Sequence, residues 1–183
     1  MAGEGEEKVL RKIITAFEPL AELATNGGAD MELGAFAHAC AHVSVFFRCL
    51  GIAFKFGEKD YVSKVDDLIE ASNSIQTLND MIELDIQQDC VTQLGSHSRN
   101  LLRVKRGLEL VKVLYEEIVK IEGNSLRDAA TVAYAKVFAA HHGWAIRKAV
   151  AAGVYALPSK SSFLQMLNED GKFFYPNVAF TAL

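Results

Sequence analysis

Apolar residues recur every three or four positions along nearly the whole chain, which is the spacing that places them on one side of a helix. No stretch alternates apolar and polar residues for long enough to build a sheet. The helical pattern breaks at 26–28, around Gly51, near Gly95, at 123–125 and at Pro158. It therefore predicts an all-α protein with helices over residues 8–24, 30–50, 59–73, 75–94, 97–121, 125–139, 142–157 and 161–168.

Length and composition favour one folded domain over residues 1–183. Half of the 183 residues are hydrophobic and only three are proline, so the chain can bury a core without disulfides or metal ions. Residues 1–7 are expected to be flexible. Residues 171–183, which include the stretch KFFYPNVAFTAL, carry no helical stripe and are expected to form an irregular tail.

Charge, cysteine spacing and hydropathy exclude several classes of protein. The 19 basic and 23 acidic residues give a net charge of −4, which argues against a nucleic-acid binder, so any anion site must be local. The three cysteines show no CxxC spacing, and we expect neither a metal site nor a cofactor. The sequence has neither the ~20 apolar residues of a membrane span nor the apolar region of a secretory signal. A cytosolic, reduced protein is expected.

The helix predicted over residues 97–121 carries an unusual cluster of cations. Its charged residues of alternating sign share a solvated side, and a stripe of apolar residues lies next to them. The solvated side consists of Lys105, Glu109, Lys112 and Glu116, and the apolar stripe of Leu101, Val104, Leu108, Val111, Tyr115 and Ile118. Arg99 and Arg103 lie outside both, on a third side that continues as Leu110 and Leu114. Such a face indicates a cationic mouth that leads to an apolar interior. Alternatively, the two arginines form structural ion pairs with a neighbouring helix, and the spacing leaves both interpretations open.

Two other sets of polar residues have the same ambiguity. Asp60 and Lys64 are one turn apart on the same side of the helix predicted over 59–73. They form either a surface ion pair or an acceptor and a cation that face one ligand. His142 precedes a helix rich in small residues, and a lone histidine is more often a core or cap residue than a ligand.

Three stretches together resemble the glycolipid transfer protein family, and within it the ceramide-1-phosphate transfer branch. They are GIAFKFGEKDYVSKVDDL, GSHSRNLLRVKRGL and HHGWAIRKAV, and the resemblance extends in order over residues 8–168. It implies a two-layer sandwich of helices that holds one sphingolipid, with the headgroup at the surface and the hydrocarbon chains in a pocket between the layers. The chain departs from the family after SFLQMLNEDG, where KFFYPNVAFTAL stands in place of the family's last helix.

The resemblance also implies a role for each candidate residue. Asp60 matches the aspartate that accepts the ceramide amide N–H, and His142 matches the histidine that donates to the amide carbonyl. Lys64, Arg99 and Arg103 match the cations that hold the phosphate.

Two of these positions separate the branches of the family. Glycolipid binders resemble this chain but have asparagine at the position of Lys64 and a sugar-stacking tryptophan at that of Arg103. A phosphate needs charged, forked donors instead. Arg106 is common to both branches, which implies at most a secondary role. Trp144 matches a membrane-contacting tryptophan, as suits its amphipathic ring; the alternative is a core indole.

We therefore expect non-vesicular transfer of a phosphorylated sphingolipid between membranes, with a transient membrane surface as the second partner and no nucleic acid. The alternative is an all-α module that recognises phosphate on a peptide or lipid without transfer. A hydrolase that uses His142 and Asp60 as acid and base is disfavoured, because no nucleophile motif such as GxSxG accompanies them. We do not expect an enzyme.

Overall fold

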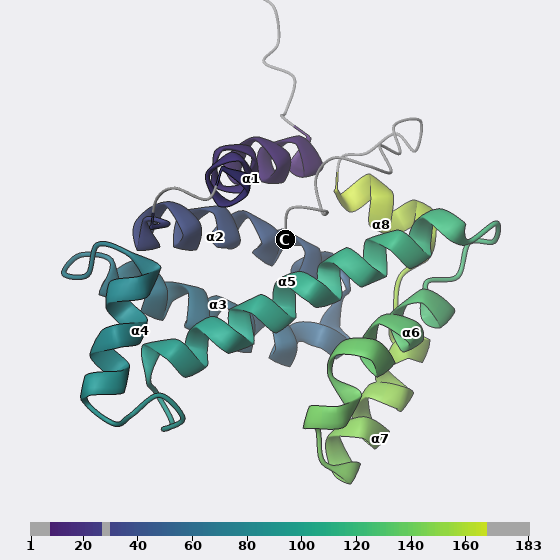
Figure 1. Ribbon diagram of the computed structural model, residues 1–183. Coiled ribbons are helices and arrows are strands. Elements are labelled where there is room, and N and C mark those ends of the chain that lie inside the picture. The colour runs from purple at the N-terminus through teal and green to yellow at the C-terminus, as the bar shows by residue number, and fades with distance from the viewer. Residues whose placement is uncertain (1–7, 27–29, 168–183) are drawn as a thin grey trace, which may run out of the picture.

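The computed structural model describes residues 8–26 and 30–167, and this part of the chain is all-helical (Figure 1). The α-helices are α1 (Val9–Thr25), α2 (Leu33–Cys49), α3 (Lys55–Ala71), α4 (Leu78–Gln87), α5 (His97–Lys120), α6 (Arg127–Val137), α7 (Trp144–Gly153) and α8 (Lys160–Met166). Short 3₁₀ turns follow three of them: η1 (Ile52–Phe54), η2 (Ala139–His141) and η3 (Val154–Ala156). The predicted all-α class is confirmed, with one α-helix for each predicted range.

Several helix boundaries differ from the prediction. The helix predicted over residues 75–94 begins at the Thr77 cap and ends at Gln87, because Asp89 and Gly95 adopt φ values of 50° and 92° that a helix does not allow. The helix predicted from residue 59 begins at Lys55, directly after η1. The expected flexible residues 1–7, the irregular tail and the missing last helix lie outside the described residues.

The helices pack in layers around one long helix. In Figure 1, α5 runs diagonally across the molecule in front of α2 and α3, and it packs against α3 and α6. Helix α2 lies between α1 and α3. Helix α8 returns to this core, where the buried Phe163 ring meets Phe46 edge to face at 5.6 Å. The predicted core stripe of α5 is buried from Val104 to Ile118, and Leu101 at its start is partly buried.

Helices α3 and α5 approach each other unusually closely at one point. A Cβ atom on Gly107 of α5 would lie 2.5 Å from the Tyr61 ring of α3, so only glycine fits there. Tyr61 also stacks on Phe47 at 4.7 Å and donates a hydrogen bond to the Cys40 carbonyl at 3.0 Å. Tyr61 thereby joins α2, α3 and α5, and sets the distance between the two helices that carry the candidate residues.

None of the helices in the described ranges is long and apolar enough to cross a membrane.

Candidate functional site

An ion pair between α3 and α5 forms the centre of the predicted site. Arg103 Nη2 donates to Asp60 Oδ2 at 2.7 Å, and Lys64 Nζ lies 4.0 Å from the other carboxylate oxygen. All three side chains are partly exposed, so a ligand can reach them. The helix period alone brings Asp60 and Lys64 together, whereas packing of α3 on α5 supplies Arg103. Arg103 therefore forms an ion pair with a neighbouring helix, and its partner Asp60 is itself a candidate ligand-binding residue. The two interpretations of Arg103 are compatible.

His142 lies in the electrostatic field of the same cluster, between η2 and α7. Its ring stacks on Phe138 with centroids 5.2 Å apart, and its Nδ1 atom is 2.9 Å from the Tyr134 hydroxyl. Burial first, then the positive charge of Arg103, holds the pKa of His142 below its usual value, although Asp60 acts in the opposite direction. The imidazole is therefore neutral near pH 7 and carries a single N–H.

The other predicted cations occupy different positions around this centre. Arg99 lies in the first turn of α5 and donates from Nη1 to the Thr92 carbonyl at 3.2 Å, so its guanidinium is held at the α4–α5 loop. Arg106 is half-buried, and its charge also lowers the pKa of His142, which places it on the same side of the molecule. Lys105 is exposed, in agreement with its predicted solvated side.

The cluster carries a local positive charge on an acidic protein. One carboxylate, that of Asp60, faces Lys64 and Arg103, and Arg106 is near enough to act on His142. Such a cluster can accept an anion. Behind it, Leu110 is half-buried against the core and Leu114 is buried, so the face that begins with Arg99 and Arg103 does continue into the apolar interior.

Helix α7 contributes no buried side chain to the described core. Trp144, at its start, is 69% exposed, so the core-indole alternative does not hold. A Cβ atom on Gly153 at its end would lie 3.6 Å from the Ala53 side chain of η1, so α7 ends beside the turn that leads into α3. Ile52 and Phe56 there are 88% and 85% exposed.

Sequence reasoning missed four residues that belong to this region. Ile52 and Phe56 could have been found from the apolar run GIAFKF, which has no helical stripe to place it in a core. Tyr134 and Phe138, which hold the His142 ring, lie eight and four residues before it in the chain. Their only sequence signal is that four-residue spacing.

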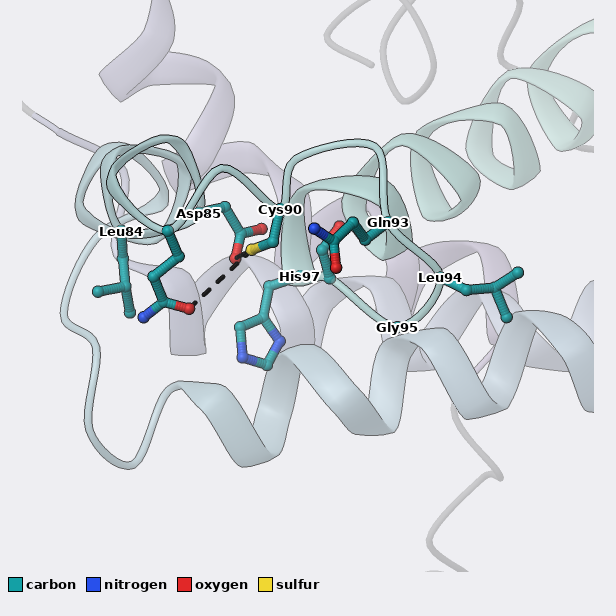
Figure 2. Close-up of a pocket in the computed structure, with 9 residues that line it drawn as sticks. Leu84, Asp85, Cys90, Gln93, Leu94, Gly95 and His97 are labelled. Atoms are coloured by element: carbon teal, nitrogen blue, oxygen red, sulfur yellow. Dashed lines mark hydrogen bonds between the residues drawn. The ribbon is translucent and has the colours of Figure 1, made fainter.

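A separate pocket of about 320 Å³ opens between the end of α4 and the start of α5 (Figure 2). Its Asp85 carboxylate accepts hydrogen bonds from the Ser98 backbone N–H at 2.6 Å and from Cys90 Sγ at 3.3 Å. Burial favours a raised pKa for Asp85, but these bonds outweigh it and lower the pKa. The carboxylate thus stabilises the α4–α5 loop through these hydrogen bonds. Among the described residues no group of three His, Cys, Asp or Glu side chains could hold a metal ion.

Comparison with known proteins points to one family. A family model described as glycolipid transfer protein matches residues 31–169. Accelerated cell death 11 of Arabidopsis thaliana is 58% identical over 171 residues, which cover 93% of this chain and 83% of that protein. A ceramide-1-phosphate transfer protein of Danio rerio is 33% identical over 135 residues, 67% of this chain and 64% of that protein.

A solved structure agrees with these relatives. The crystal structure of an aspartate-to-alanine mutant of Arabidopsis accelerated cell death 11, complexed with C12 ceramide-1-phosphate, has a TM-score of 0.87 and 57% identity, and the match covers 90% of this chain and 82% of that one. The predicted helical sandwich and the predicted resemblance are both confirmed. The chain belongs to the glycolipid transfer protein family.

Proposed function

We propose that this protein binds a phosphorylated sphingolipid of the ceramide-1-phosphate type and transfers it between membranes without vesicles. The observation that carries the proposal is the Asp60–Arg103 ion pair, with Lys64 beside it and His142 in its field. A 58% identical relative, crystallised as a mutant with ceramide-1-phosphate, supports the choice of lipid. The proposal assigns one lipid-transfer domain to residues 1–183.

Ligand binding exchanges the partners within the cluster. The lipid phosphate takes the place of the Asp60 carboxylate on Arg103, and Lys64 and Arg99 supply further charged donors. Asp60, released from Arg103, accepts the amide N–H of the ceramide, and His142 donates to the amide carbonyl. Arg106 adds positive charge from a second position. The phosphate thereby meets cations, the amide N–H meets an acceptor and the amide carbonyl meets a donor.

The hydrocarbon chains supply most of the affinity. Each buried CH₂ contributes about 0.8 kcal/mol, and the leucines behind Arg103 mark the direction in which the chains enter the apolar interior. The phosphate contacts then mainly determine which headgroup is accepted. A sugar headgroup would leave the forked donors of Arg103 without an anion.

Membrane contact is proposed at Trp144, together with Ile52, Phe56 and Tyr155. These side chains are exposed and apolar or amphipathic, which favours the boundary between lipid headgroups and water. We propose a cytoplasmic protein that binds membranes peripherally and reversibly. We also propose that it leaves the lipid chemically unchanged, because Asp60 is paired with Arg103 and His142 with Tyr134 rather than with each other.

The test is transfer of fluorescent ceramide-1-phosphate between vesicles, with fluorescent glucosylceramide in parallel. We expect selective transfer of the phosphate lipid. Arg103→Ala should lower that transfer about ten- to a hundredfold, the effect of losing charged hydrogen bonds, whereas Lys105→Ala on the exposed side of α5 should have no effect.

Other outcomes would contradict parts of the proposal. If Arg103→Ala lowered the transfer of both lipids equally, the proposal that Arg103 binds the lipid phosphate would be wrong. Binding of ceramide-1-phosphate without any transfer, by protein that is folded according to circular dichroism, would favour a phosphate-recognising module. Lipid recovered in altered form after long incubation would indicate an enzyme.

A further inference from the structure

Two aromatic side chains at the end of α6 hold the His142 ring, and neither has a role in the function proposed above. Phe138 stacks on the ring with an interplanar angle of 16° and a centroid distance of 5.2 Å. Tyr134 lies one turn earlier, with its hydroxyl oxygen 2.9 Å from His142 Nδ1. Phe138 therefore fixes the plane of the imidazole, and Tyr134 fixes one of its two nitrogens.

The direction of this hydrogen bond determines the tautomer of His142, because a phenol can both donate and accept. Burial raises the pKa of Tyr134, so the phenol keeps its hydrogen. The hydroxyl can donate this hydrogen to His142 Nδ1, which lies 2.9 Å away. A neutral imidazole has one N–H, so when Nδ1 accepts from Tyr134, the ring hydrogen is on Nε2.

We propose that Tyr134 is a positioning residue that holds His142 in the Nε2–H tautomer, so that the histidine presents a donor to the amide carbonyl of the lipid. This rests on the proposed function, in which His142 donates to that carbonyl. In the other tautomer Nε2 is an acceptor and would face a second acceptor, the carbonyl oxygen. Tyr134 thereby helps the site to select lipids that carry an amide carbonyl.

The geometry separates this role from simple packing. Tyr134→Phe keeps the ring and leaves the Phe138 stack in place, and removes only the hydroxyl that bonds Nδ1. A residue that acted only through packing would not change the tautomer, and it would affect lipids with and without the carbonyl to the same extent.

The first measurement is the ¹⁵N spectrum of protein labelled on its histidine rings, with the His142 signals identified by their absence in His142→Ala. We expect the Nε2–H form in the wild type and a mixture of both tautomers in Tyr134→Phe. A wild-type spectrum with the hydrogen on Nδ1 would overturn the proposal, whether or not any variant folds well.

The second measurement is equilibrium binding of two lipids: ceramide-1-phosphate, and an analogue that keeps the phosphate and both chains but has CH₂ in place of the carbonyl. Tyr134→Phe should weaken the binding of ceramide-1-phosphate about three- to tenfold, as expected for one neutral hydrogen bond. It should leave the affinity for the analogue unchanged. In a His142→Ala background it should have no further effect. Equal weakening of both lipids would overturn the proposal.

The two measurements also distinguish this proposal from the one on which it rests. If His142→Ala binds ceramide-1-phosphate as tightly as the wild type does, the amide contact of the proposed function is wrong and Tyr134 has no role in lipid selection. The ring spectrum of the wild type still decides the tautomer in that case.

Discussion

At the scale of single residues, the site depends on one weak ion pair that can exchange its partner. Asp60 is 2.7 Å from Arg103 and 4.0 Å from Lys64. Because these side chains are partly exposed, such a pair contributes about 1 kcal/mol at most. A phosphate can therefore displace the carboxylate from Arg103 at little cost. Arg99 is held by the Thr92 backbone carbonyl, and within residues 8–26 and 30–167 no carboxylate pairs with it that a ligand would have to replace.

Acidic pH should destabilise the free protein through His142. Its pKa is lowered by burial first and then by Arg103, so the unfolded chain takes up this proton at a higher pH than the native protein. The stabilisation is therefore complete above the unfolded pKa of about 6.5 and declines as the pH falls below it. We expect the free energy of unfolding, measured in urea, to decrease more steeply between about pH 6.5 and 5 in the wild type than in His142→Gln. Parallel curves would show that another group is responsible.

At the scale of helices, the contact between Gly107 and Tyr61 determines whether the site is assembled. Asp60 and Tyr61 are neighbours on α3, and Arg103 and Gly107 lie one turn apart on α5. The same close approach that presses the Tyr61 ring on Gly107 therefore brings the Asp60 carboxylate to the Arg103 guanidinium. Packing and ligand binding are coupled at this point.

Gly107→Ala should weaken both stability and phosphate binding. The new Cβ would lie 2.5 Å from the buried Tyr61 ring, and overpacking of this kind costs about 1–3 kcal/mol. Separation of α3 from α5 would also lengthen the Asp60–Arg103 contact. Urea denaturation and ceramide-1-phosphate binding measure the two effects.

Gly57→Ala is the matched control for this change. Gly57 lies in α3, the helix that faces Gly107 of α5, but a Cβ on Gly57 meets no atom within 4 Å. Alanine should therefore stabilise the helix by about 0.5–1 kcal/mol. If the two alanine variants behaved alike, the close approach would have no energetic importance.

At the scale of the whole molecule, one group of exposed apolar side chains lies at the end that carries α7 and the start of α3. Helix α7 ends close to η1, where a Cβ atom on Gly153 would lie 3.6 Å from Ala53. Trp144 of α7, Ile52 of η1 and Phe56 at the start of α3 are exposed. The α4–α5 loop lies on the other side of the molecule in Figure 1. The end that carries Trp144 thus presents an exposed apolar patch suited to a membrane surface, and the exposed Leu94 of the α4–α5 loop offers a comparison on the other side.

Phe56→Ser should lower vesicle binding and transfer several-fold without lowering stability, because the Phe56 side chain is 85% exposed. Leu94→Ser is the control, since Leu94 is 89% exposed but belongs to the α4–α5 loop. Sedimentation with vesicles and the transfer assay measure both. Equal losses in the two variants would indicate that the membrane contact is not confined to the end that carries α7.

Much of the fold and part of the site could be predicted from local spacing. The 3.6-residue period located every α-helix and placed Asp60 and Lys64 on one side of α3. The predicted end of the helix over 75–94 was wrong, because the spacing of apolar residues carries no information on the left-handed backbone conformation of Asp89. The assignment of headgroup roles came from resemblance to a family and remains a proposal.

The sequence by itself determined the helices, because hydrogen bonds and side-chain faces within a helix depend on neighbours a few positions away. It also determined the local excess of cations on an acidic chain. Only the tertiary structure decided that Asp60 pairs with Arg103, that Tyr134 bonds His142 and that Trp144 is exposed. These outcomes depend on distances between elements far apart in the chain. Such distances are set by how whole side chains pack, as Tyr61 does on Gly107.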